Sequence, residues 1–311
     1  MKLVFCGTPR FAVPTLEALL AAGHEVPLVV TQPDRPVGRT QELAAPPVKQ
    51  TALAAGIAVT QPEKIRNNEE FRARLESIAP DAILVVAYGR IIPPWMLELP
   101  RYGCINLHAS LLPKYRGAAP IQWAVAEGET VTGNTTMLLE EGLDTGPILL
   151  QEERAIAPDE TAADLFDALA VGGAPLVVKT LAGLEAGTIT PKPQDHARAT
   201  LAPILTRDEG RMDFAVRTAK QLADRWRGFQ PWPGAFTALN GKKLIVHKLV
   251  VANRGGDAEP GSVVVDGGRM LVACAQGTWL ELLEVQMEGK KRMPAADFLR
   301  GMQVRTGARL G

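Results

Sequence analysis

The stretch "DAILVVAYG", residues 81–89, is a short continuous run of apolar residues that ends in glycine. Such a run is typical of a central strand in a parallel sheet, because helices cover that strand on both faces. A similar run, "KLVFCG" at 2–7, opens the chain, and "GCINLH" at 103–108 follows. We therefore expect these three runs to be strands of one sheet.

Segments with helical spacing separate these strands. Apolar residues recur at intervals of three and four in "FAVPTLEALLAAG" at 11–23 and "NNEEFRARLESIAP" at 67–80, and residues 161–187 predict a long helix. Alternation of strands and helices is typical of a doubly wound α/β sheet, which binds ligands at the carboxyl ends of its strands. Residues 1–190 are thus predicted to form one α/β domain.

The composition is that of an ordinary soluble protein, with 46% hydrophobic and 22% charged residues in 311. The apolar runs considered as strands fall far below the ~18 residues of a membrane span, and the N-terminus reads as a strand rather than a signal peptide. Three scattered cysteines, Cys6, Cys104 and Cys274, indicate neither a disulfide framework nor a zinc site. We expect a cytoplasmic protein without a metal and without a membrane partner.

The pattern changes at about residue 191. Residues 191–207 contain three prolines and no clean periodicity, which indicates a linker. One amphipathic helix is predicted over 212–229, followed by five or six short β-rich runs with turns such as Asn240-Gly241. This pattern predicts a small barrel of the oligonucleotide-binding (OB) type in a second domain, 208–311.

The net charge of zero conceals a difference between the two parts of the chain. Residues 1–204 carry 17 Lys and Arg against 23 Asp and Glu, and residues 205–311 carry 17 against 11. A split of −6 and +6 indicates a nucleic-acid or acidic partner for the second part, with chance distribution over a solvated surface as the alternative.

Two polar residues, Asn106 and His108, stand two apart where the strand at 103–108 ends. On spacing alone, a hydrogen-bonded structural pair is the more common explanation. A third group changes this balance, because Asp144 stands between Gly142 and Gly146 in a predicted loop after a strand. An amide donor and an imidazole held protonated by a carboxylate are suited to stabilising the oxyanion of a carbonyl addition.

Other motifs point away from common enzyme classes. "GTPRFA" after the first strand has one glycine where a dinucleotide site needs three, and Ser110 lacks the G-x-S-x-G context of a serine hydrolase. The remaining histidines stand apart and are interpreted as surface residues. Basic and aromatic residues mix in "GKKRM" at 289–293 and "DRWRGFQPWP" at 224–233, which suits RNA and equally suits a solvated face over core tryptophans.

Long motifs give the chain a resemblance to a known family. "INLHASLLPKYRGAAPIQ" at 105–122 and "EEGLDTGPIL" at 140–149 resemble the signature of folate-dependent formyltransferases. Four more, "VTQPDRPVGR", "VVAYGRIIP", "RDEGRMDF" and "FQPWPGAF", are similar to the branch of that family that acts on methionyl-tRNA. The resemblance covers essentially the whole chain.

The resemblance implies a Rossmann-like formyltransferase domain, a linker and a C-terminal OB-like barrel that helps to hold tRNA. It places the family's catalytic Asn, His and Asp at Asn106, His108 and Asp144. It also implies a folate site at the turn of Ser110, Leu111, Leu112 and Pro113. The implied reaction transfers the formyl group of 10-formyltetrahydrofolate to the α-amino group of initiator methionyl-tRNA, and a monomer is our expectation.

One segment departs from the family pattern. The insertion after the second strand is often rich in Lys and Arg and wedges against the tRNA acceptor end in this family. Here it reads "RPVGRTQELAAPP", which keeps Arg35 and Arg39 but follows them with Thr, Gln and Glu. We expect Arg39 and the basic second domain to supply phosphate contacts.

Two alternative functions remain at this point. The first is a formyltransferase that acts on a small amine, such as glycinamide ribonucleotide or an amino-sugar nucleotide, which would need no basic barrel. The second is a non-catalytic RNA-binding protein on the same scaffold, against which the intact Asn106, His108 and Asp144 argue.

Overall fold

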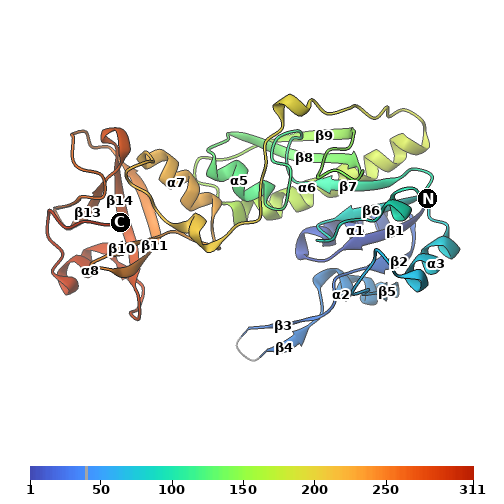
Figure 1. Cartoon of the computed structure of the whole chain (residues 1–311), viewed down its shortest axis with the longest axis horizontal. Coiled ribbons are helices and arrows are strands. Elements are labelled where there is room, and N and C mark those ends of the chain that lie inside the picture. The colour runs from blue at the N-terminus through green and yellow to red at the C-terminus, as the bar shows by residue number, and fades with distance from the viewer. Residues whose placement is uncertain (39–40) are drawn as a thin grey trace. The chain divides into compact units, whose positions relative to one another are not determined.

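The computed structural model describes the whole chain except residues 39–40. It contains two compact units (Figure 1). Unit 1 consists of Met1–Pro120, Val131–Ala155 and Asp164–Pro203, and unit 2 consists of Ile121–Thr130, Ile156–Ala163 and Ile204–Gly311. Segments 121–130 and 156–163, which the sequence placed in the first domain, thus group with the C-terminal unit.

Unit 1 is built on a seven-stranded sheet with the order β5-β2-β1-β6-β7-β8-β9, which confirms the predicted α/β fold. The strands are β1 (Lys2–Gly7), β2 (Glu25–Val30), β5 (Ala58–Thr60), β6 (Ala82–Val86), β7 (Cys104–His108), β8 (Val131–Leu138) and β9 (Ile148–Ala155). All five residues of β6 are buried, as expected for a strand with neighbours on both sides.

Helices follow these strands along the chain. They are η1 (Arg10–Ala12), α1 (Val13–Ala21), α2 (Pro47–Ala54), α3 (Glu69–Ile78), α4 (Pro94–Leu97), α5 (Pro120–Ala126) and α6 (Ala162–Glu185). Helix α3 begins where the Asn68 side chain accepts a hydrogen bond from the Phe71 N–H. Among the described residues, α6 alone is long and apolar enough to cross a membrane. Half of its apolar window is buried, and Thr180 bonds Thr136 of β8 at 2.8 Å, so that α6 is a core helix of the fold.

The sheet is not entirely parallel. Strand β8 runs antiparallel to β7, pairing Ile105 with Leu138 and His108 with Thr135. The end of β8 therefore lies beside the start of β7, and the loop that follows β8 must return along the sheet to reach His108.

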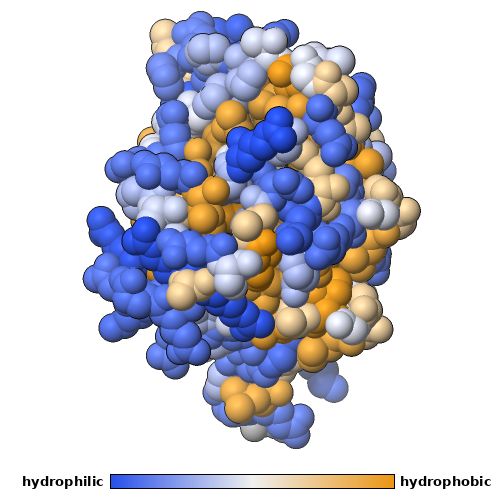
Figure 2. Space-filling view, turned by 90° about the vertical axis from the view of Figure 1, so that its right-hand side faces the viewer, coloured by the Kyte–Doolittle hydropathy of each residue, from blue (hydrophilic) through white to orange (hydrophobic). Residues whose placement is uncertain are grey.

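The segment 33–47, predicted to be irregular, contains a two-stranded hairpin of β3 (Arg35–Val37) and β4 (Glu42–Ala44). The hairpin projects from unit 1 (Figure 1), and at the lower edge of Figure 2 it carries apolar as well as hydrophilic side chains. Leu43 on β4 is 72% exposed. Arg39 lies outside the described residues.

Unit 2 contains a curled antiparallel sheet of six strands, β10-β11-β14-β13-β12 with β15 beside β14, where the sequence predicted five or six. They are β10 (Phe236–Leu239), β11 (Lys242–Ala252), β12 (Val263–Asp266), β13 (Arg269–Ala273), β14 (Trp279–Met287) and β15 (Met293–Pro294). The C-terminal tail bridges the two edge strands, because Gly311 N–H donates to Ala238 at 3.1 Å and Val263 N–H donates to Ala308 at 2.8 Å. The arrangement confirms a small barrel-like domain.

Two helices complete unit 2, α7 (Ala219–Gly228) and α8 (Ala295–Met302), with short turns η2 (His196–Arg198), η3 (Arg207–Gly210) and η4 (Ala275–Gly277) elsewhere in the chain. The helix predicted from residue 212 begins at Ala219, because Thr218 and Gln221 form a capping box there. Gly228 packs on α5, where a Cβ would approach the Ala126 nitrogen to 2.6 Å, and Trp123 meets Phe229 at 5.6 Å between ring centroids. These contacts explain why residues 121–130 belong to unit 2.

The two compact units differ less in net charge than the two parts of the sequence do. Unit 2, with its two segments from the first half of the sequence, carries 17 Lys and Arg against 15 Asp and Glu. Unit 1 carries 17 against 19, so the split of −6 and +6 becomes −2 and +2. The net charge of unit 2 therefore does not by itself indicate a nucleic-acid partner, whereas the positions of its cations can.

Candidate active site

Strand β7 places Asn106 and His108 on one face of the sheet, because side chains two apart in a strand point the same way. Both are buried, with 9% and 6% of their surface exposed. The Asn106 carboxamide makes no side-chain hydrogen bond within the part of the chain that the structure describes. Its nitrogen and oxygen are not among the described side-chain atoms that are fully buried without a partner, so the carboxamide is open to solvent and available to a substrate oxygen.

The His108 ring is held through one of its nitrogens. Its Nε2 lies 2.9 Å from the carbonyl oxygen of Tyr115, and a carbonyl oxygen can only accept, so Nε2 carries a proton and donates it. The other nitrogen, Nδ1, is consequently the atom that can gain or lose a proton during a reaction.

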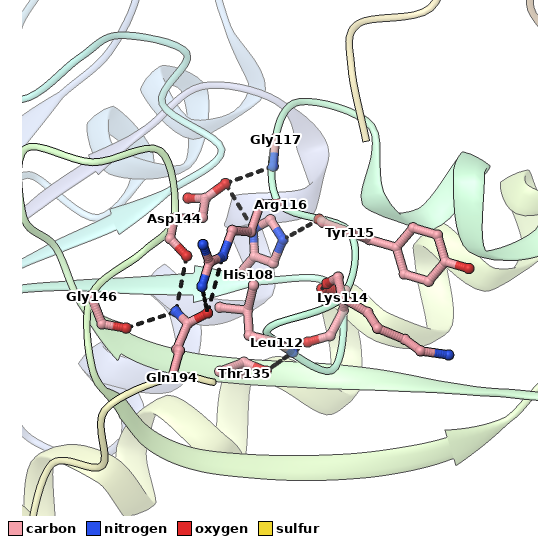
Figure 3. Close-up of polar contacts among 11 residues, drawn as sticks. His108, Leu112, Lys114, Tyr115, Arg116, Gly117, Thr135, Asp144, Gly146 and Gln194 are labelled. Atoms are coloured by element: carbon pink, nitrogen blue, oxygen red, sulfur yellow. Dashed lines mark hydrogen bonds and ion pairs between the residues drawn. The ribbon is translucent and has the colours of Figure 1, made fainter. Parts of the chain in front are cut away.

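Asp144 comes from the loop between β8 and β9 and turns its carboxylate toward His108 (Figure 3). Its Oδ2 lies 3.7 Å from His108 Nδ1 and accepts a hydrogen bond of 2.8 Å from the Gly117 N–H. The first distance exceeds a hydrogen bond, so the two side chains attract each other as an ion pair when the ring is protonated. The structure thus brings together the three residues that the sequence singled out.

The path of this loop depends on a glycine. Because β8 runs antiparallel to β7, the chain folds back past the end of β8, and a Cβ at Gly146 would overlap the Leu138 carbonyl oxygen. Asp144 itself has φ of 49°, a left-handed conformation that is uncommon for a residue with a side chain. The surroundings of Asp144 must therefore stabilise this conformation.

The turn at 110–113 is internally bonded. Thr135 Oγ1 donates to the Ser110 carbonyl oxygen at 2.6 Å and accepts from Leu112 N–H at 3.2 Å, while Gln151 Nε2 donates to the Leu112 carbonyl oxygen at 2.9 Å. Ser110 Oγ donates to the Lys114 carbonyl oxygen at 2.7 Å. These main-chain groups already have partners, and the half-buried Leu111 and Pro113 lie beside them.

Sequence reasoning missed four participants in the site. Tyr115 binds His108 through its carbonyl group, Gly117 binds Asp144 through its N–H, and Arg116 and Gln194 connect the two loops (Figure 3). The signal for Gly117 was that the residue is a glycine. In the structure its φ is 124°, and a Cβ there would lie 2.6 Å from the Ala202 carbonyl oxygen. Gln194 gave no signal, because its proline-rich surroundings read as a linker.

A second polar network joins the carboxyl ends of β1, β2 and β6. Thr8 Oγ1 and Gln32 Nε2 donate to the Tyr88 carbonyl oxygen at 3.2 and 3.1 Å, and Arg90 Nε donates to Gln32 Oε1 at 3.1 Å. Burial raises the pKa of the Tyr88 phenol, whose hydroxyl is buried without a partner, so this group stays neutral. The network supports the loop after β6, where Ile91 is 88% exposed.

The three remaining histidines, which the sequence predicted to be surface residues, differ in exposure, and His196 bonds Arg116 of the site. His24 and His247 are half-buried and His196 is exposed. Among the described residues, no group of three or more His, Cys, Asp and Glu side chains is arranged to hold a metal ion.

Comparison with known families gives matches over both parts of the chain. Residues 1–181 match the family model described as formyl transferase, and residues 204–303 match the one described as formyl transferase, C-terminal domain. The methionyl-tRNA formyltransferase of Acidobacterium capsulatum is 70% identical over 311 residues and covers 100% of both chains. That of Koribacter versatilis is 58% identical and covers 100% of this chain and 99% of its own.

Solved structures show the same fold at much lower identity. An N-formyltransferase from Helicobacter canadensis, in complex with folinic acid and dTDP-3-aminofucose, is 19% identical with a TM-score of 0.67, over 92% of this chain and 99% of its own. HypX from Aquifex aeolicus, in complex with tetrahydrofolic acid, is 16% identical with a TM-score of 0.60, over 96% of this chain and 47% of its own.

Proposed function

The chain belongs to the methionyl-tRNA formyltransferase family, and from this premise we propose how it formylates methionyl-tRNA. The formyl donor is 10-formyltetrahydrofolate, and the products are N-formylmethionyl-tRNA and tetrahydrofolate. The acceptor is the initiator tRNA, and the protein acts as a cytoplasmic monomer.

The surface around the site fits a folate. A pterin is flat and apolar on its faces, and large apolar side chains are exposed on both loops that flank β7. Ile91 follows β6, and Leu143, 63% exposed, directly precedes Asp144. The rigid turn of Ser110, Leu111, Leu112 and Pro113 adds Leu111 and Pro113 as contacts. These residues bind and orient the donor so that its formyl carbon meets β7.

Asn106 stabilises the charge that develops in the reaction. When the α-amino group of methionyl-tRNA forms a C–N bond with the formyl carbon, the formyl oxygen becomes negative. The Asn106 carboxamide is buried and has no other partner among the described residues, so that it can donate to this oxygen without first breaking a bond.

His108 and Asp144 are assigned the proton transfer from the amine to the folate nitrogen. Protonated at Nδ1, the His108 ring stands beside Asp144 and supplies a second donor to the developing oxyanion. The amine loses one proton as it becomes an amide, and the folate nitrogen gains one as its bond to the formyl carbon breaks. We assign this transfer to Nδ1 and the Asp144 carboxylate, since Nε2 is bound to Tyr115.

Contacts to tRNA are assigned to two parts of the chain. On unit 1, the projecting hairpin carries Arg35 and exposes Leu43, which suits contact with the acceptor end, and the sequence assigns Arg39 to the same contact. On unit 2, none of five cations makes an ion pair with a described residue: Lys242, Lys243, Lys290, Lys291 and Arg305.

The cations on unit 2 are neighbours in the fold. The Glu288 N–H donates to the Lys243 carbonyl oxygen at 2.9 Å, which brings the turn of Lys290 and Lys291 beside the start of β11. Lys242 and Arg305 line one cavity of about 320 Å³. Unpaired cations gathered in this way suit a phosphate backbone.

The observation that carries the proposal is the convergence of an unpartnered buried amide, a ring with one free nitrogen and a carboxylate. The test offers the purified chain 10-formyltetrahydrofolate together with methionyl-tRNA, glycinamide ribonucleotide or an amino-sugar nucleotide. We expect formyl transfer to methionyl-tRNA only. Transfer to a small amine at a comparable kcat/KM, or no transfer to any acceptor, would contradict the proposal.

A further inference from the structure

Gln194 is a buried glutamine whose carboxamide is fully hydrogen-bonded beside the active site (Figure 3). Its Nε2 donates to the carbonyl oxygens of Asp144 at 2.9 Å and Gly146 at 2.7 Å. Its Oε1 accepts from Arg116 Nε at 3.1 Å and Nη2 at 2.6 Å. One side chain therefore connects the Asp144 loop with the loop that follows β7.

The orientation of this carboxamide follows from the chemistry of its partners. A guanidinium only donates, so the Gln194 oxygen must face Arg116, and carbonyl oxygens only accept, so the NH₂ group must face the loop. Arg116 is 6% exposed and has no carboxylate oxygen within 4.0 Å among the described residues. Its other bond, from Nη2, is to His196 Nδ1 at 3.2 Å.

The two loop bonds act at and just after Asp144, on the C-terminal side of the Cα that carries its carboxylate. Asp144 is held in a left-handed conformation with φ of 49°, and its Oδ2 is aimed at Gly117 N and His108 Nδ1. Gln194 binds the carbonyl of Asp144 itself and that of Gly146 two residues on. Without these bonds the loop would lose the contacts that hold this uncommon backbone conformation.

The segment that contains Gln194 is itself fixed to the site. Lys192 and Ile148 exchange two main-chain hydrogen bonds of 2.8 Å, and Arg116 N–H donates to the Thr200 carbonyl oxygen at 2.9 Å. Ala202 N–H donates in turn to the Arg116 carbonyl oxygen at 2.7 Å. The segment expected to be a simple linker, residues 191–207, is thus hydrogen-bonded to both loops of the active site.

We propose that Gln194, oriented by Arg116, is a positioning residue that holds the Asp144 carboxylate against His108. The proposal rests on the proposed formyl transfer, because it assigns Gln194 an effect on that reaction through Asp144. A displacement of about 1 Å at a reacting group can cost about 10²-fold in rate, which sets the size of the expected effect.

The first experiment replaces Gln194 in the full chain by Glu and by Ala. Gln194→Glu keeps the size and a partner for Arg116 but has no hydrogen to donate, and it sets a negative charge against two carbonyl oxygens. We expect kcat to fall by about 10²-fold for both variants, with the KM values for methionyl-tRNA and the folate changed by less than about threefold. The matched control is Gln276→Glu, an exposed glutamine of unit 2 in the turn η4, which should retain wild-type kcat.

A double-mutant cycle separates positioning from a general structural role. If Gln194 acts through Asp144, the variant with both Gln194→Glu and Asp144→Asn should be no slower than Asp144→Asn alone, within about twofold. Thermal unfolding followed by circular dichroism checks that each variant is folded under the assay conditions. If Gln194→Ala does not fold, Gln194→Glu alone is used for the test.

Three results would overturn the proposal: a kcat of Gln194→Glu within about twofold of wild type, losses that multiply in the double variant, or a raised KM with unchanged kcat. Failure of the proposed function looks different, because the wild-type chain would then form no N-formylmethionyl-tRNA at all.

Discussion

The Oδ2 atom of Asp144 lies 3.7 Å from Nδ1 of His108 and accepts its hydrogen bond from the Gly117 N–H instead. The carboxylate is therefore fixed by the backbone of the neighbouring loop and acts on the ring through its charge. Because Nε2 donates to Tyr115, the ring cannot turn its other nitrogen away from Asp144 without losing that bond. The pair is arranged so that Nδ1, and not Nε2, faces the carboxylate.

Replacement of Asp144 by Asn should test the charge separately from the shape. We expect Asp144→Asn to lower kcat by about 10²–10⁴-fold, the usual contribution of a positioned acid or base. The amide retains an oxygen for the Gly117 N–H, so binding of tetrahydrofolate, measured by titration calorimetry, should stay near wild type.

The control for this variant is Asp159→Asn, an exposed aspartate without a hydrogen bond or ion pair among the described residues. A loss of folate binding in Asp144→Asn, with little loss of kcat at saturation, would mean that Asp144 binds the folate and takes no part in proton transfer.

Replacement of Asn106 by Asp should remove one oxyanion donor at constant size. Loss of such a donor typically costs about 10²–10³ in kcat, or about 2.7–4 kcal/mol of transition-state stabilisation. Since the interaction forms only in the transition state, kcat and kcat/KM should fall together. The exposed Asn67→Asp is the matched control. Turnover near wild type in Asn106→Asp would return this residue to a structural role.

The sequence was sufficient for the sheet and for the three central side chains. The apolar run of β6 and the ends of β7 carry local signals, and Asn106, His108 and Asp144 stand in motifs of ten to twenty residues. The groups that hold them could not be found in this way. Tyr115 acts through its main chain, which any residue possesses, and Gln194 reaches Asp144 across 50 positions of sequence.

Strand direction and unit membership also escaped the sequence pattern. The antiparallel direction of β8 is fixed by its pairing with β7. Similarly, residues 121–130 join unit 2 because Gly228 allows α7 to approach α5 closely, a contact between positions about a hundred apart. Both features depend on long-range packing, on which local periodicity carries no information.

Ionisation of Asp34 should make the stability of the hairpin of β3 and β4 depend on pH. Hydrogen bonds from Lys49 Nζ, at 2.8 and 2.9 Å, and from Gln61 Nε2, at 2.7 Å, lower the pKa of this carboxyl group at the base of β3. A lowered pKa in the folded state means that the ionised form favours the native arrangement. This stabilisation is present above the unfolded pKa of about 4 and is lost as the pH falls through the folded pKa.

We therefore expect the hydrogen-exchange protection of the β3 and β4 amides, relative to their intrinsic exchange rates, to fall at acid pH in the wild type and to be low already at neutral pH in Asp34→Asn. The same variant should raise the KM for methionyl-tRNA severalfold and leave the folate KM unchanged, because the hairpin is assigned to the tRNA. An unchanged hairpin exchange rate in Asp34→Asn would show that the Lys49 and Gln61 bonds do not anchor it.

Binding of tRNA should depend steeply on salt, and part of this dependence should come from the turn of unit 2 that carries Lys290 and Lys291. Each lysine that neutralises a phosphate releases counterions, so its loss should reduce the slope of log K against log salt concentration by about 1. We expect Lys290→Gln and Lys291→Gln each to weaken tRNA binding and flatten this slope, while kcat at saturating tRNA stays at the wild-type value.

The control is Lys179→Gln, an exposed lysine of α6 on unit 1, which should leave the slope unchanged. Fluorescence anisotropy of labelled tRNA at salt concentrations between about 50 and 200 mM measures the affinity for tRNA and its dependence on salt. Slopes in both unit 2 variants equal to that of the wild type would place the phosphate contacts elsewhere, and the hairpin with Arg35 and Arg39 would then be the segment to substitute.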